Sequence, residues 1–92
     1  MKTDLRVTAQ CFHFLSVPTR LAILQLLAEN PLNVTTIART LGITRKLTSE
    51  HLRLLRIGRL VNVERWDRIT RYSVDKAAMK AMASDLRSLM PR

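Results

Sequence analysis

Cationic side chains gather in one stretch of the chain, between residues 45 and 71. Half of the 16 lysines and arginines fall in this window, and the net charge of the chain is +9. Arginine outnumbers lysine twelve to four, and the guanidinium fork fits both phosphate oxygens and the edge of a guanine. The clustering therefore predicts a nucleic acid as partner, in preference to a charged face that is only solvated.

Residue types that serve catalysis are few and scattered. The chain has two histidines, one cysteine and seven acidic residues. We find no glycine-rich phosphate loop, no serine–histidine–aspartate set and no paired carboxylates in a plausible cleft. Two histidines and one cysteine are too few for a tetrahedral metal site within one subunit. The sequence predicts no enzyme, no metal and no cofactor.

Cys11 is the single thiol, so the chain forms no internal disulfide, as is usual in a reducing compartment. Free cysteine usually packs as a small buried hydrophobe. The alternative is a redox or electrophile sensor, which requires an intersubunit disulfide or an adduct because there is no resolving cysteine. No apolar run is long enough for a signal peptide or a membrane span, so we expect a cytoplasmic protein with no membrane partner.

Helical spacing of apolar residues and capping residues predict five helices in a single domain spanning residues 1–92. The first covers about residues 4–15, the second opens at Pro18, and the last runs to about Leu89. The predicted caps of the first, third, fourth and last helices are Thr3 or Asp4, Asn33, Thr44 and Asp75. Residues 60–64 and 69–74 alternate like strands around a tip at residues 65–68. The predicted fold is mainly α, a winged helix-turn-helix with a two-stranded hairpin wing.

The third and fourth helices meet across Gly42, which is the signature of a helix-turn-helix. In the fourth helix, Thr48, Leu52 and Leu55 share one face by their spacing and are expected to be buried. The cationic residues lie off that face. The first turn of this helix is therefore expected to present Arg45 and its neighbours to bases or phosphates.

The same residues resemble a known family. "LSVPTRLAILQLLA", "IARTLGITRKLTSEHLRLLRIGRLV" and "RWDRITRYSV" are similar to the opening, the helix-turn-helix and the wing of ArsR/SmtB-family winged-helix repressors. The resemblance covers about residues 12–75 and implies a homodimer on a palindromic operator, released by a signal. The family usually has glycine where this chain has Arg59, and Gly58 precedes it here. The fourth helix is therefore expected to end one residue early.

The resemblance does not extend to the metal sites of the family. Its sensors carry a Cys-Val-Cys box where this chain reads Asn33-Val34-Thr35, or Asp and His ligands on the last helix, where residues 75–92 contain no histidine. Metal sensing by either route is therefore not expected, and the effector stays unknown.

The predicted sites follow from these elements. The DNA-binding residues are expected to be Thr44, Arg45, Lys46, Leu47, Ser49, Glu50 and Arg53 in the fourth helix, Thr35 and Thr36 in the third, and Arg65, Arg68 and Arg71 in the wing. Thr35 and Thr36 serve equally well as plain helix caps. The first and last helices are expected to form the dimer interface through Leu5, Phe12, Met79, Met82, Leu86 and Leu89.

The predicted function is that of a homodimeric repressor that binds double-stranded DNA at a palindromic operator. One alternative is a sequence-indifferent DNA-coating protein with the same fold, which would bind random and cognate DNA equally. The other is a protein-interaction module that docks an acidic partner, which would bind DNA weakly even at low salt.

Overall fold

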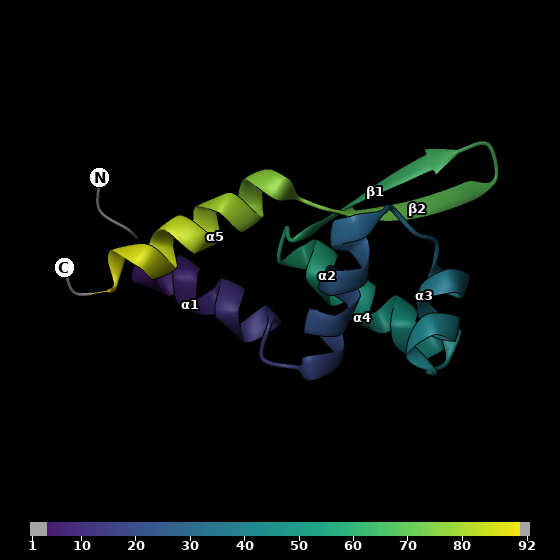
Figure 1. The fold of residues 1–92 in the computed structure, drawn as a ribbon, viewed down its shortest axis with the longest axis horizontal. Coiled ribbons are helices and arrows are strands. Elements are labelled where there is room, and N and C mark those ends of the chain that lie inside the picture. Colours follow the sequence, from purple (N-terminus) through teal and green to yellow (C-terminus); the bar gives the residue numbers. More distant parts are fainter. Residues whose placement is uncertain (1–3, 91–92) are drawn as a thin grey trace.

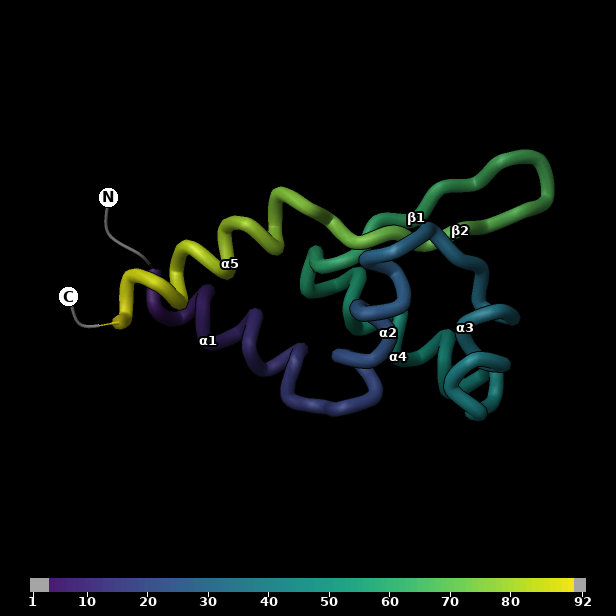
Figure 2. Tube along the Cα trace, in the orientation of Figure 1, coloured from purple at the N-terminus to yellow at the C-terminus, as the bar shows by residue number. Residues whose placement is uncertain are grey.

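The computed structural model describes residues 4–90 and has five helices and one hairpin. The elements are α1 (Leu5–Phe14), α2 (Pro18–Glu29), α3 (Val34–Leu41), α4 (Arg45–Ile57), β1 (Val61–Trp66), β2 (Ile69–Val74) and α5 (Lys76–Ser88). In Figure 1, α1 and α5 form one end of the elongated molecule, and α3, the start of α4 and the hairpin tip form the other. Figure 2 shows α5 turning away from the hairpin to run beside α1. The predicted fold is confirmed.

Local hydrogen bonds explain where the helices begin. The side chains of Asp4, Asn33, Thr44 and Asp75 accept backbone N–H bonds from the first turns of α1, α3, α4 and α5 at 2.8–3.0 Å. Pro18 lies at the start of α2, and Gly42 ends α3 in the left-handed region at φ 69°. The alternative cap Thr3 lies outside the described residues.

The core forms where α2, α3, α4 and the base of the hairpin meet. Its fully buried side chains are Ile23, Ile37, Thr48, Leu52, Leu55 and Leu60. The Thr48 hydroxyl donates to the Thr44 carbonyl at 2.8 Å, so its burial leaves no unmet hydrogen bond. The predicted inner face of α4 is thereby confirmed. In α2, Ile23, Leu24 and Leu27 are buried, whereas Leu21 and Ala28 are exposed.

The hairpin is longer than the sequence indicated. Antiparallel pairing runs from Val61 opposite Val74 to Trp66 opposite Ile69, which leaves a two-residue tip of Asp67 and Arg68. The prediction of a four-residue tip is wrong, because residues 65 and 66 continue the ladder. Asp67 has a φ of 53°, a conformation that short hairpin loops require and aspartate tolerates.

The end of α4 also differs from the expectation. The helix runs to Ile57, Gly58 keeps a right-handed conformation, and Arg59 takes the left-handed one at φ 60°. The helix therefore does not end one residue early at Gly58. Gly58 is needed for space instead, because a Cβ there would lie 2.6 Å from the ring of Phe14.

We expect Gly58→Ala to destabilise the protein by about 1–3 kcal/mol, because the Phe14 ring must move. Arg59→Gly should stabilise it by about 0.5–1 kcal/mol, since a left-handed arginine is strained by more than the chain entropy of glycine costs. Urea unfolding followed by circular dichroism measures both. If Arg59→Gly destabilises the protein instead, Arg59 is not the left-handed residue, and an unchanged stability in Gly58→Ala would show that the Phe14 ring leaves room for a Cβ.

The α1–α5 end is joined by a polar contact and lined by apolar side chains. The buried Thr8 of α1 donates to Asp85 of α5 at 3.2 Å. Large apolar side chains exposed on these helices and just after α5 are Leu5, Val7, Leu86, Leu89 and Met90. Among the predicted interface residues, Phe12 and Met79 are half-buried against the core, and Met82 is 8% exposed. Within the single chain, Met82 is therefore a core residue.

Within residues 4–90, no single helix is long and apolar enough to cross a membrane. Only α1 and α2 taken together reach that length and composition, and they are bent by 89° relative to each other.

Candidate nucleic-acid interface

The fourth helix has the two faces that its sequence predicts. Thr48, Leu52 and Leu55 hold it against the core. Its opposite side is open to solvent, and Leu47 there is 45% exposed. The predicted DNA-contacting residues that are exposed on this helix and its cap are Thr44, Arg45, Lys46, Leu47, Ser49, Glu50 and Arg53. The burial pattern thus leaves the cationic side of α4 free to enter a groove.

A hollow of about 310 Å³ joins three separate elements at this end of the molecule. Thr35 near the start of α3, Arg45 at the start of α4 and Arg68 at the hairpin tip all line it. Asn33 and Thr70 also border it. Sequence reasoning predicted these two arginines and the threonine separately, and the fold brings them to one concave, cationic surface suited to a phosphate backbone.

The three wing arginines point in different directions. In a hairpin, neighbouring side chains alternate between faces and directly paired residues share one. Arg65 pairs with Thr70 and Arg71 pairs with Glu64, so these two arginines lie on opposite faces, and Arg68 alone occupies the tip. The expectation that Arg65 belongs to the tip is therefore wrong.

Arg65 lies near Arg56, which is not among the predicted DNA-binding residues. It lines a hollow with Arg56 of α4 and with Tyr72 of β2. The helical spacing of Arg56 from Arg53 is visible in the sequence. Its position beside the wing, however, depends on the hairpin register, which the sequence did not settle.

Asn33, and neither of the two threonines, caps α3. The backbone N–H of Thr36 donates to the Asn33 side chain at 2.8 Å, and the carbonyl of Thr36 accepts from the Thr40 hydroxyl at 2.8 Å. Both Thr35 and Thr36 are half-buried. Of the two, Thr35 borders the hollow that Arg45 and Arg68 share.

Glu50 and Arg53 form a two-pronged ion pair on the exposed side of α4. Arg53 donates to the two carboxylate oxygens at 3.1 Å and 2.7 Å. These hydrogen bonds, aided by the opposite charges, lower the pKa of Glu50 and raise the pKa of Arg53. The fork of Arg53 is therefore engaged by Glu50 in the free protein, and a phosphate would have to compete for it.

Glu50→Gln should release Arg53 for phosphate contact. We expect DNA affinity at low salt to rise about threefold to tenfold, and the salt dependence to steepen by about one unit of slope. Titrations of labelled DNA at several salt concentrations measure both quantities. Glu29→Gln makes the same charge change on α2 and should leave the slope unaltered. An unchanged slope in Glu50→Gln would place Arg53 away from the DNA.

His51 links α4 to the rest of the helical core. The Nε of Arg20 in α2 donates to His51 Nδ1 at 3.4 Å, and an Nη of Arg20 donates to the Phe14 carbonyl at 3.3 Å. Burial, followed by the nearby positive charge of Arg20, lowers the pKa of His51, and Glu50 opposes this in part. A neutral imidazole accepts the Arg20 hydrogen bond, and a protonated one cannot. His51 thus connects α4 to α2 through this hydrogen bond.

We expect the free energy of unfolding to decrease as the pH falls below about 6.5, the ordinary pKa of histidine. The unfolded chain then takes up a proton that folded His51 accepts only at lower pH, so this stability exists above pH 6.5 and is lost on acidification. Urea unfolding at a series of pH values tests this. His51→Gln, which keeps an acceptor, should flatten the decrease, and His13→Gln should not. The same decrease in His51→Gln would assign it to other groups.

Cys11 and Trp66 lie outside this surface. Cys11 is half-buried on α1 and packs against the core. Trp66 is 74% exposed on the outward face of the hairpin, next to Pro31. Within residues 4–90, no three histidine, cysteine or acidic side chains gather closely enough to hold a metal ion.

The chain is similar to known proteins in both sequence and fold. A family model described as "Bacterial regulatory protein, arsR family" matches residues 17–63, which is just over half of the chain. No curated protein sequence matches.

Solved structures are similar over nearly the whole chain. An ArsR-like transcriptional regulator from Rhodococcus sp. RHA1 is 27% identical with a TM-score of 0.84, covering 92% of this chain and 80% of that one. HlyU from Vibrio cholerae N16961 is 27% identical with a TM-score of 0.79 and covers 97% of each chain. A homodimeric winged helix-turn-helix DNA-binding domain from Mycobacterium bovis is 26% identical with a TM-score of 0.78, covering 95% and 86%.

Proposed function

Because the chain belongs to the arsR family of bacterial regulatory proteins, we propose that it is a homodimeric repressor that occupies a palindromic DNA site. Family membership makes it a DNA-binding transcriptional regulator and not an enzyme. Three parts of the proposal go beyond family membership: the homodimer, the palindromic site and repression. The arrangement of the two ends of the molecule supports them.

The hollow shared by α3, α4 and the wing is the observation that carries the proposal. It places Thr35, Arg45 and Arg68 on one surface. Arg45 begins a helix whose inner face is locked in the core, so its direction relative to the wing is fixed. A fixed helix start and a wing tip on one surface can contact a major groove and the flanking backbone together.

The opposite end of the molecule supports dimerisation. The exposed apolar side chains Leu5, Val7, Leu86, Leu89 and Met90 gather on α1, α5 and the residues just after α5. We call this set the seam. Large apolar side chains that are exposed at one end of a molecule favour an interaction site there. Pairing two chains through the seam would direct two recognition helices outward, and they would enter successive major grooves roughly 34 Å apart.

In this mechanism the protein represses transcription by occupying its site. Arg45, Lys46, Leu47 and Ser49 read bases from the first turns of α4. Arg65, Arg68 and Arg71, together with Thr35 and Thr36, fix the register on the backbone. An effector would act by changing the relation between the two subunits.

A DNA-binding titration tests the proposal. The region upstream of the protein's own gene is compared with shuffled DNA of the same composition, at two salt concentrations, with Cys11 reduced and then oxidised. A preference of about a thousandfold for the upstream DNA fits a specific regulator. Loss of that preference on oxidation would make Cys11 a sensor.

Two other outcomes would replace the proposal. Equal binding to both DNA fragments would indicate a DNA-coating protein, and no binding even at low salt would indicate a protein partner. Sedimentation equilibrium gives the oligomeric state independently. A chain that stays monomeric at micromolar concentration would contradict the proposed binding of a homodimer to a palindromic site.

A further inference from the structure

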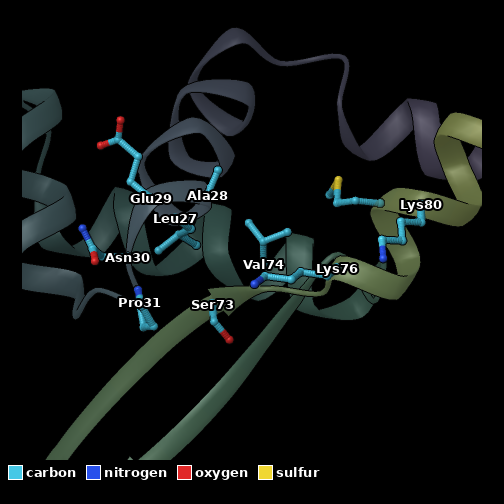
Figure 3. A pocket seen from close by; sticks show the side chains of 10 residues that line it. Leu27, Ala28, Glu29, Asn30, Pro31, Ser73, Val74, Lys76 and Lys80 are labelled. Carbon is cyan, nitrogen blue, oxygen red and sulfur yellow. The ribbon is translucent and has the colours of Figure 1, made fainter.

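A second hollow lies away from the DNA-facing end, where the C-terminal end of α2, the end of β2 and the start of α5 meet (Figure 3). Its volume is about 530 Å³, within the range of small-molecule sites. Apolar side chains from all three elements line it, namely Leu27 of α2, Val74 of β2 and Met79 of α5. Leu27 is almost completely buried, so the apolar lining is continuous with the core.

Two lysines of α5 add positive charge to this apolar hollow. Lys76 and Lys80 both line it and are exposed. They are four residues apart on one helix, a spacing at which like charges repel each other. The ion pairs of residues 4–90 are Arg6–Asp4 and Glu50–Arg53, so neither lysine has an acidic partner there.

Glu29 is the acidic residue that lines the hollow. In Figure 3 its carboxylate points away from both lysines, whose amino groups end at separate points, that of Lys76 beside Val74 and that of Lys80 nearer α5. The positive charge beside the apolar lining is therefore not neutralised by Glu29.

This combination restricts the chemistry of a ligand. An inorganic anion would leave the apolar lining uncovered, and a neutral hydrocarbon would leave both ammonium groups without a partner. A cationic ligand would be repelled. We propose that this hollow binds a small organic anion with an apolar body, such as a medium-chain carboxylate, with its carboxylate at Lys76 and Lys80 and its body against Leu27, Val74 and Met79.

The position of the hollow gives such a ligand a regulatory consequence. Val74 ends the second strand of the wing, and Met79 lies on α5, the helix that carries part of the seam. A ligand between them changes the packing of the wing against α5, and so couples its own binding to that of DNA. This consequence, unlike the binding itself, rests on the proposed function.

The ligand site is tested by NMR titration of the ¹⁵N-labelled full chain with octanoate, octylammonium and octanol. We expect saturable shifts with octanoate at the amides of Leu27, Ser73, Lys76 and Met79, weaker ones with octanol and none with octylammonium. The double substitution Lys76→Gln and Lys80→Gln should weaken octanoate binding at least about tenfold, because it removes both charge-assisted contacts. Arg87→Gln removes one cation from the far end of α5 and should leave octanoate affinity unchanged.

Equal shifts with octylammonium, or shifts spread over the seam leucines in place of the hollow, would overturn the ligand site. So would octanoate affinity that survives the double substitution in a protein whose spectrum stays native. A DNA titration with and without octanoate measures the coupling. Failure of the proposed function appears there as equal affinity for upstream and shuffled DNA without ligand, while failure of the ligand site appears in the NMR titration, where no DNA is present.

Discussion

Leu86→Glu is expected to convert the proposed dimer to a monomer and to lower affinity for DNA with two half-sites about a hundredfold. Leu86 is 52% exposed on α5, so the folded monomer tolerates a charge there. Across a seam of apolar side chains, the same charge would be buried without a partner. The loss of affinity follows because two half-site contacts no longer form on one molecule. Sedimentation equilibrium measures the mass, and titration of one-site and two-site DNA measures the affinities.

Ser84→Glu is the matched control. It adds the same charge to the same helix at an exposed position, about half a turn away from the line of Met82, Leu86 and Leu89. It should leave both mass and affinity close to those of the original protein. A dimer that persists in Leu86→Glu would show that the subunits meet elsewhere.

Arg45→Ala is expected to cost about 1–3 kcal/mol of binding free energy on the cognate site, and much less on shuffled DNA. Arg45 begins α4 and lines the hollow with Arg68, so in the proposed mechanism removing its fork takes away a base contact. Competition titrations between cognate and shuffled DNA measure the change in preference.

Arg68→Ala provides the contrast for Arg45→Ala. As a phosphate contact from the wing tip, Arg68 should contribute to every sequence alike, and its loss should lower the salt slope by about one. If Arg45→Ala leaves both affinity and preference intact, α4 does not read the DNA through its first turn.

The helices were predictable because their ends depend on neighbours in the sequence. Asn33, Thr44 and Asp75 each cap the turn that follows them. The burial of Thr48 with Leu52 and Leu55 followed from helical spacing alone. The chemistry of the cationic surface was likewise visible in the composition of residues 45–71.

What the sequence did not predict depends on contacts between distant residues. Alternation of residue types does not say how far a ladder extends, so Arg65 and Trp66 were assigned to the tip although they pair with β2. The need for glycine at position 58 comes from Phe14, which lies 44 positions earlier in the chain. Met82 has the spacing of a surface stripe, yet it is buried in the core cluster.

Because the molecule is elongated, a small rotation at one end moves the other end by a large distance. The seam and the cationic surface of α3, α4 and the hairpin tip lie near opposite ends of a long axis of 46 Å. A rotation of about 10° at the seam would move the far end by about 8 Å, and interfaces in allosteric proteins repack through angles of this size. Successive base pairs are about 3.4 Å apart, so this displacement spans more than two base-pair steps. In the proposed dimer, a change of packing confined to α5 is thus sufficient to move the two recognition helices out of register with their half-sites.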